Sequence, residues 1–252
     1  MPTTTSMTLD TDRLRLEMDG RIATFWIDVP DASVNTISEA TLDAFEEAVD
    51  LLRNRATIRG AVFISAKKNT FIAGADLDML KAFDMPADVR ALSRRAHRLL
   101  ERLQKLPIPT VAAINGPAMG GGLEMTLGCS YRIATTHDKT VMALPEVKLG
   151  LLPGGGGTQY LPRLVGVQQA LTMMLTGKNI YPKKAKRIGL VDALIHPHGL
   201  HQAAVDAARR LADGTLTPNR DKQSFTERLL ESNPVSRRII YQQAGERAQK
   251  QT

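Results

Sequence analysis

The 252-residue chain has one cysteine, few aromatic residues and no long uninterrupted apolar run. Because Cys129 is the only cysteine, an internal disulfide and a zinc site built on several cysteines are excluded. The longest apolar stretch, residues 110–127, is broken by an Asn-Gly-Pro segment and three glycines, so no membrane-spanning helix is expected. Residues 1–12 are rich in Thr and Asp and lack the apolar core of a secretory signal. We therefore expect a reducing, cytoplasmic location without membrane contact.

Other features that the sequence lacks limit the classes of protein to which the chain could belong. Basic residues exceed acidic ones by 33 to 26, which favours anionic partners, but aromatics make up only 4% and no RNA-binding motif is present. Nucleic acid is therefore not an expected partner. The sequence contains no G-x-S-x-G, P-loop or strand–GxGxxG–helix pattern, which argues against a serine hydrolase or a nucleotide-binding enzyme. His196, His198 and His201 have no supporting acid and are interpreted as a solvated loop, so no metal is expected.

The hydrophobic fraction of 43% supports a large core, and its periodicity predicts a layered α/β unit. The predicted strands are a hairpin of residues 14–18 and 22–27, then 60–65, 110–115, 131–135, 140–144 and 190–195. One predicted helix spans residues 87–105, and others start after Ser38, at Asp76, at 120–122 and after Gly157. From about residue 199 the sequence changes to charged helices. We place a core over residues 1–198 and a helical extension over 199–252.

Two glycine-rich loops are candidates for binding negative charge. One is Ala73-Gly74-Ala75, just before Asp76, and the other is the triple glycine at 120–122. Backbone N–H groups at a helix start lack partners within the helix and point at incoming negative charge. If the loops face each other, one N–H from each forms an oxyanion hole. The alternative is that the glycines serve only tight turns and close helix packing.

Two glutamates, Glu124 and Glu146, lie beside glycine-rich segments in apolar surroundings, 22 residues apart. Burying a carboxylate among apolar groups is costly and shifts its pKa toward neutrality. Enzymes typically use a pair of such carboxyl groups to transfer protons or activate water at neutral pH. Alternatively, Glu124 is an ordinary exposed helix residue and Glu146 an acid at a helix N-terminus.

Three segments, in this order and spacing, resemble a known family. They are Ala73-Gly-Ala-Asp76, Asn115-Gly-Pro-Ala-Met-Gly-Gly-Gly-Leu-Glu124, and Pro145-Glu146 followed by Pro153-Gly-Gly-Gly-Gly-Thr-Gln159. From about residue 13 to 198 the chain is similar to the enoyl-CoA hydratase/isomerase (crotonase) superfamily. The resemblance implies an α/β fold made of a spiral of ββα units, with two roughly perpendicular sheets and a C-terminal helical extension.

The resemblance also implies roles for individual residues. The N–H groups of Ala75 and Gly121 would form the oxyanion hole for the thioester oxygen of an acyl-CoA. Glu124 and Glu146 match the two hydratase acid/base residues, and Gly154 matches a residue whose backbone helps to place the water. The coenzyme A thioester is the substrate, and no separate cofactor is implied. The residues assigned to substrate and CoA binding are Ala32, Val34, Lys68, Ala73, Gly74, Asp76 and Lys81.

The implied reaction is addition of water to trans-2-enoyl-CoA to give 3-hydroxyacyl-CoA in fatty-acid β-oxidation, with 3-to-2 isomerisation as a second activity. Residues 234–252 resemble the linker helix of bifunctional fatty-acid-oxidation alpha subunits. This suggests the hydratase part of such a subunit, either a piece of a longer protein or a naturally short relative. The resemblance to such a subunit also implies association with a thiolase partner or formation of a homo-oligomer. Two alternatives stay open: isomerisation as the main activity, or a non-catalytic module that binds RNA or protein. That module would use the basic stripe of Arg90, Arg94, Arg98 and Arg102.

Overall fold

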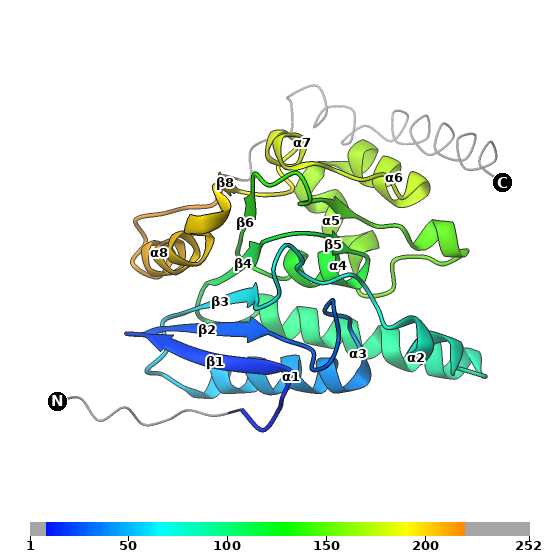
Figure 1. Cartoon of the computed structure of the whole chain (residues 1–252), viewed down its shortest axis with the longest axis horizontal. Coiled ribbons are helices and arrows are strands. Elements are labelled where there is room, and N and C mark those ends of the chain that lie inside the picture. The colour runs from blue at the N-terminus through cyan, green and yellow to red at the C-terminus, as the bar shows by residue number, and fades with distance from the viewer. Residues whose placement is uncertain (1–8, 220–252) are drawn as a thin grey trace.

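The computed structural model describes residues 9–219, which form two β-sheets and the helices that cover them (Figure 1). The six-stranded sheet has the order β1-β2-β3-β4-β6-β8, and a two-stranded sheet pairs β5 with β7. The large sheet consists of β1 Leu14–Asp19, β2 Ile22–Ile27, β3 Gly60–Ser65, β4 Thr110–Ile114, β6 Tyr131–Thr135 and β8 Ala193–Ile195. The small sheet consists of β5 Ala118–Met119 and β7 Met142–Ala143.

Only the first pair of strands in the large sheet is antiparallel. β1 and β2 form the predicted hairpin, with Leu14 opposite Ile27 and a tight turn in which Gly20 has a φ of +61°. All later pairs in this sheet are parallel, so each needs a crossover connection, usually a helix. The predicted strands are present, but two are shorter than expected. The strand predicted over 140–144 is limited to β7, and the one predicted over 190–195 begins only at Ala193.

Eight α-helices occur among the described residues. They are α1 Glu39–Asn54, α2 Leu77–Lys81, α3 Pro86–Gln104, α4 Gly121–Leu127, α5 Gly157–Val165, α6 Val167–Thr176, α7 Pro182–Arg187 and α8 Leu200–Ala212. Short 3-10 helices span η1 Glu146–Leu149 and η2 Pro197–Gly199. Ser38 caps α1 as predicted, because its side chain accepts a hydrogen bond from Thr41 N–H. Asp76, expected as the first helical residue, is instead the N-cap of α2.

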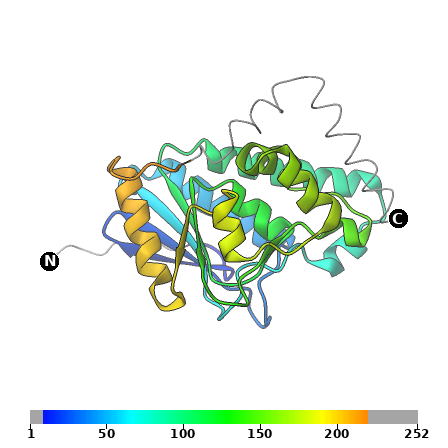
Figure 2. The same ribbon diagram turned by 90° about the horizontal axis from the view of Figure 1, so that it is seen from above.

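Strands β3, β4 and β6 of the large sheet are buried on both faces, and the two faces belong to different apolar clusters. Along β3, Ala61 and Phe63 face the main core, whereas Val62 and Ile64 face a second cluster beneath α8. This alternation follows from the two-residue period of a strand. Viewed from above, α8 lies on one side of the sheet and α4, α5 and α6 on the other (Figure 2).

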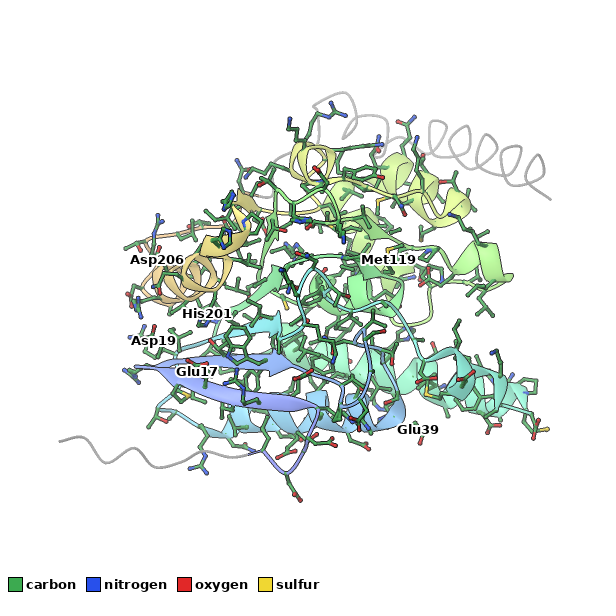
Figure 3. All side chains as sticks on the ribbon, in the orientation of Figure 1. Glu17, Asp19, Glu39, Met119, His201 and Asp206 are labelled. Carbon is green, nitrogen blue, oxygen red and sulfur yellow. The ribbon has the colours of Figure 1, made fainter. Side chains whose placement is uncertain are left out.

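Helix α8 packs directly on the sheet, although it lies beyond the boundary placed at residue 198. Ala204, Val205 and Ala208 are buried in the second cluster. At the start of the helix, His201 lies over β2, where its ring centroid is 4.8 Å from that of Trp26 and its Nε2 is 3.2 Å from Thr24 Oγ1 (Figure 3). The boundary itself stays a prediction, because residues 220–252, including the proposed linker helix, lie outside the described part.

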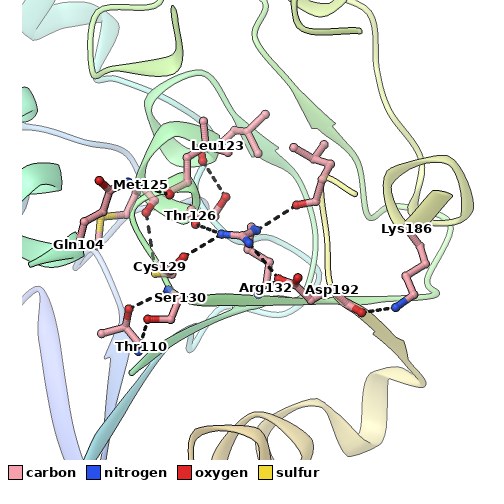
Figure 4. Close-up of polar contacts among 12 residues, drawn as sticks. Gln104, Thr110, Leu123, Met125, Thr126, Cys129, Ser130, Arg132, Lys186 and Asp192 are labelled. Atoms are coloured by element: carbon pink, nitrogen blue, oxygen red, sulfur yellow. Dashed lines mark hydrogen bonds and ion pairs between the residues drawn. The ribbon is translucent and has the colours of Figure 1, made fainter. Parts of the chain in front are cut away.

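A buried arginine, ion-paired with Asp192, links the C-terminal end of helix α4 to the sheet (Figure 4). Arg132 of β6 is 1% exposed, and its guanidinium donates to Asp192 at 2.9 Å. The same guanidinium donates to the carbonyls of Thr126 and Cys129, at 3.2 and 2.8 Å. These carbonyls lie at and just after the C-terminal end of α4, where helix carbonyls lack partners within the helix. Arg132 therefore satisfies the end of the helix that carries Glu124, an arrangement that no sequence pattern predicted.

Candidate active site

A cavity of about 270 Å³ brings together the principal residues predicted for the site. Its walls include Ala75, Gly121, Glu124, Glu146 and Gly154. The rest of the lining is almost entirely apolar and comes mainly from α1, α2, α3 and the segment after η1. These residues include Leu42, Phe45, Met79, Leu80, Val89, Leu92, Ala96, Leu99, Leu100, Leu151 and Leu152. The apolar face of α3, the helix predicted over 87–105, therefore forms a cavity wall as well as part of the core.

The two glycine-rich loops meet at this cavity. A Cβ placed on Gly120 would lie 3.9 Å from the Cα of Gly74, so the loops are in close contact. Ile37 hydrogen-bonds to Gly74 O and Asp76 N–H, in a parallel bridge around Ala75. Because successive peptide groups of an extended chain point to opposite sides, the N–H of Ala75 faces away from Ile37. Gly121 is the first residue of α4, and its N–H has no acceptor within that helix.

Glu124 is held by backbone N–H groups of the glycine-rich segment at residues 154–157. Its side chain is buried, with 3% of the residue exposed. Gly155 N–H donates to both of its carboxylate oxygens, at 3.0 and 2.9 Å, and Gly157 N–H donates to Oε1 at 2.6 Å. Burial raises the pKa of Glu124, and the hydrogen bonds from Gly157 and Gly155 act in the opposite direction. The interpretation of Glu124 as an ordinary exposed helix residue is therefore wrong.

Glu146 has a different environment at the start of η1. Its Oε2 is buried and accepts no hydrogen bond from the described residues, and its Oε1 lies 3.0 Å from where a Cβ on Gly120 would be. Burial raises the pKa of Glu146 to about 7, and the charge of Glu124 acts in the same direction. Two backbone N–H groups therefore offset part of the effect of burial on the pKa of Glu124, whereas the buried Oε2 of Glu146 has no such donor among the described residues and this carboxyl titrates near neutrality.

The residues assigned to CoA binding lie outside the cavity lining, and several have structural contacts. Asp76 caps α2 by accepting hydrogen bonds from Asp78 and Met79 N–H at 2.9 and 3.1 Å. Lys81 forms an exposed ion pair with Asp78 at 3.0 Å. Ala73 N–H donates to Asn35 O, and Gly74 O accepts from Ile37 N–H, both at 2.8 Å. Lys68 and Val34 are exposed, and Ala32 is partly exposed. Their roles in binding CoA stay predictions.

The described residues also bear on the remaining sequence predictions. Within residues 9–219, no three His, Cys, Asp or Glu side chains are placed to hold a metal ion. In the same range, no helix combines the length and apolar character needed to cross a bilayer. In the basic stripe of α3, Arg102 is paired with Asp50, whereas Arg90, Arg94 and Arg98 are exposed.

The fold and the site define an α/β protein of the crotonase type, and comparisons with known proteins agree. The family model described as enoyl-CoA hydratase/isomerase matches residues 17–244. The chain therefore belongs to the enoyl-CoA hydratase/isomerase family, as its motifs predicted.

Individual relatives give the same result. The chain is 46% identical over 235 residues to the fatty acid oxidation complex subunit alpha of Shewanella loihica, covering 93% of this chain and 33% of that protein. It therefore spans about a third of the length of the curated relatives it matches. The structure of Pseudomonas aeruginosa DspI is similar, with a TM-score of 0.76, 36% identity and 85% coverage of each chain. An enoyl-CoA hydratase from Bacillus anthracis gives a TM-score of 0.74 at 28% identity, covering 93% of this chain and 90% of the other.

Proposed function

We propose that the chain adds water to trans-2-enoyl-CoA to give 3-hydroxyacyl-CoA, as part of fatty-acid β-oxidation. The observation that carries this proposal is the difference between the two carboxyl groups of one cavity. Glu124 accepts three N–H contacts, whereas Glu146 has a buried oxygen with no donor among the described residues. Hydration needs one carboxylate and one carboxylic acid at the same time, and these environments favour that division.

In the proposed reaction, ionised Glu124 accepts a proton from water while the water oxygen forms a bond to C3 of the enoyl group. The electron pair of the double bond moves toward the thioester carbonyl, whose oxygen gains negative charge. The N–H groups of Ala75 and Gly121 stabilise that charge, and such a donor contributes roughly 3–4 kcal/mol in comparable sites. Glu146 then delivers its proton to C2. The product is a 3-hydroxyacyl thioester, with Glu124 protonated and Glu146 ionised, and proton exchange with solvent restores both groups.

The apolar lining supports a fatty acyl substrate. Val89, Leu92, Ala96, Leu99 and Leu100 of α3 form one wall of the cavity that holds the glutamates. An alkyl tail along this wall would remove apolar surface from water, which contributes about 25 cal/mol per Å². The coenzyme A thioester is the substrate in this proposal, with no additional cofactor. Association with a thiolase, a homo-oligomeric state and a cytoplasmic location remain predictions from the resemblance.

The test is turnover of 2-enoyl-CoA substrates by single variants. Glu124→Gln and Glu146→Gln should each lower kcat by roughly 10²–10⁴-fold, the usual contribution of a positioned acid or base. Consumption of the conjugated thioester is followed by its absorbance over a series of chain lengths. Glu101→Gln is the matched control, because Glu101 is an exposed glutamate of α3 that forms an ion pair with Lys105. A double glutamine variant that kept normal hydratase turnover would refute the proposal.

Isomerisation is the second candidate, favoured by the buried Oε2 of Glu146, which accepts no hydrogen bond from residues 9–219. A single carboxyl that removes a proton from C2 and returns one to C4 would move a double bond from C3 to C2. This reaction needs Glu146 but not the water held by Glu124. Turnover of 3-enoyl-CoA should therefore survive Glu124→Gln and fail in Glu146→Gln. Loss of both activities in both variants would count against isomerisation by this route.

A further inference from the structure

The peptide group between Gly154 and Gly155 is hydrogen-bonded through both its carbonyl and its N–H. Ser93 of α3 lines the cavity, and its hydroxyl donates a hydrogen bond to Gly154 O at 2.7 Å. The carbonyl of Gly154 and the N–H of Gly155 belong to the same peptide group, and that N–H donates to both oxygens of Glu124. The Ser93 hydroxyl is therefore connected to the Glu124 carboxylate through a single planar unit.

Glycine on both sides of this peptide group allows backbone conformations in which the group is rotated. Glycine occupies all four positions from 154 to 157, and glycine accepts backbone conformations that other residues avoid. A Cβ on Gly154 would find its nearest neighbour 4.0 Å away, so packing restricts that residue little. A half-turn of the peptide about its two flanking bonds would remove the N–H from Glu124 and direct a carbonyl toward it. Such a change would replace a stabilising donor with a repelling oxygen.

We propose that Ser93 is a positioning residue for hydration, because its hydroxyl holds the Gly154–Gly155 peptide in the orientation that presents N–H to Glu124. The proposal rests on the proposed hydratase function for its catalytic consequence. The hydrogen-bond link itself is independent of that function. Among the described residues the Ser93 hydroxyl is hydrogen-bonded to Gly154 O and not to Glu124, so its effect on that carboxyl passes through the backbone.

The groups around Glu124 indicate how removal of the Ser93 hydroxyl should change the pKa of this carboxyl. His97 of α3 acts on this carboxyl to lower its pKa, Glu146 of η1 is the other acid of the cavity, and the N–H groups of Gly155 and Gly157 contact it directly. Losing the Gly155 donor leaves the other groups in place and removes one interaction that lowers the pKa of Glu124. The base then holds its proton to higher pH, so the acid limb of the pH–rate profile moves upward.

The experiment compares Ser93→Ala, Ser93→Thr and Thr215→Ala in the whole chain. The probe is crotonyl-CoA, with kcat/KM measured across the pH range. Ser93→Ala should lower kcat/KM near neutrality roughly three- to tenfold, the range of one hydrogen bond, and move the acid limb to higher pH. Ser93→Thr keeps a hydroxyl and should restore both. Thr215→Ala removes another hydroxyl-to-carbonyl bond, to Arg210 O at 3.2 Å, distant from the cavity, and should match the wild type.

A titration that does not depend on turnover separates this inference from the proposed function. The Glu124 carboxyl, observed by ¹³C NMR, should titrate at higher pH in Ser93→Ala than in the wild type. If the wild type hydrated no enoyl-CoA but this titration moved, the proposed function would fail while the link from Ser93 to Glu124 stood. If the wild type were active and neither the titration nor the acid limb moved, the role of Ser93 would be wrong. A drop in rate without rescue by Thr would also overturn it.

Discussion

The N–H of Gly157 lies 2.6 Å from Oε1 of Glu124, so the first residue of α5 donates to a carboxylate on α4 from 33 residues away in sequence. A helix N-terminus carries partial positive charge and favours an anion at that position. The contact joins two glycine-rich motifs that are separate in the sequence. The site therefore depends on how α4 and α5 pack against each other.

The raised pKa of Glu146 predicts a dependence of stability on pH. Its ordinary pKa is 4.5, and burial raises it to about 7 in the folded protein. Between these values the folded state holds a proton that the unfolded chain has released. The contribution of this group to the free energy of unfolding therefore falls as pH rises from 4.5 to 7. Glu146→Gln should lose less thermal stability between pH 5 and pH 8 than the wild type. Parallel melting curves across this range would contradict the prediction.

Substitution by alanine should destabilise the protein at Gly122 and have little effect on its stability at Gly154. A Cβ on Gly122 would lie 2.4 Å from the backbone oxygen of Ile72, whereas a Cβ on Gly154 meets nothing closer than 4.0 Å. Because a backbone atom cannot move aside cheaply, Gly122→Ala should destabilise by about 1–3 kcal/mol or prevent folding. Gly154→Ala should stay within about 0.5 kcal/mol of the wild type. Urea unfolding of both variants gives the comparison, and equal midpoints would show that α4 can shift away from Ile72.

Removing one partner of the Arg132–Asp192 pair should lower the free energy of unfolding far more than removing one partner of a surface pair. Its side chains are 2% and 4% exposed, so removing one partner leaves a charge with little access to water. Asp192→Asn should cost about 3–5 kcal/mol in the free energy of unfolding. The control is Asp19→Asn in the exposed Arg209–Asp19 pair at 3.3 Å, which should cost less than about 1 kcal/mol. Similar losses in the two variants would mean that the buried pair is compensated elsewhere.

Substitution in the cavity wall should change chain-length preference. Ala96 lines the cavity, whereas Ala91 of the same helix is exposed and does not. Ala96→Phe should lower kcat/KM for long-chain enoyl-CoA by roughly tenfold or more, since buried methylenes contribute about 1–3 kcal/mol each to discrimination. Crotonyl-CoA should be little affected, and Ala91→Phe should resemble the wild type. An equal loss for every chain length in Ala96→Phe would show that the tail lies elsewhere.

Local patterns in the sequence predicted most elements because their causes are local. The hairpin in residues 14–27 and the Ser38 cap are built from hydrogen bonds between residues close in sequence, and the strand at 60–65 is marked by its unbroken run of buried residues. The short strand β7 was overestimated because its length depends on pairing with β5 and on the bridge between Met142 and Ile180. The end of a strand is set by its partners, which local pattern does not contain.

The sequence alone determined the fold class, the two glutamates and the glycine-rich loops beside them, because glycine and buried acids are costly unless a backbone or a site requires them. Only the tertiary structure decided how the acids differ. The donors to Glu124 come from Gly155 and Gly157, and the close approach of Glu146 to Gly120 comes from another segment. The same holds for Arg132 at the end of α4 and Ser93 behind the Gly154 peptide. Hydrogen bonds between residues distant in sequence depend on packing angles and separations, which no short motif encodes.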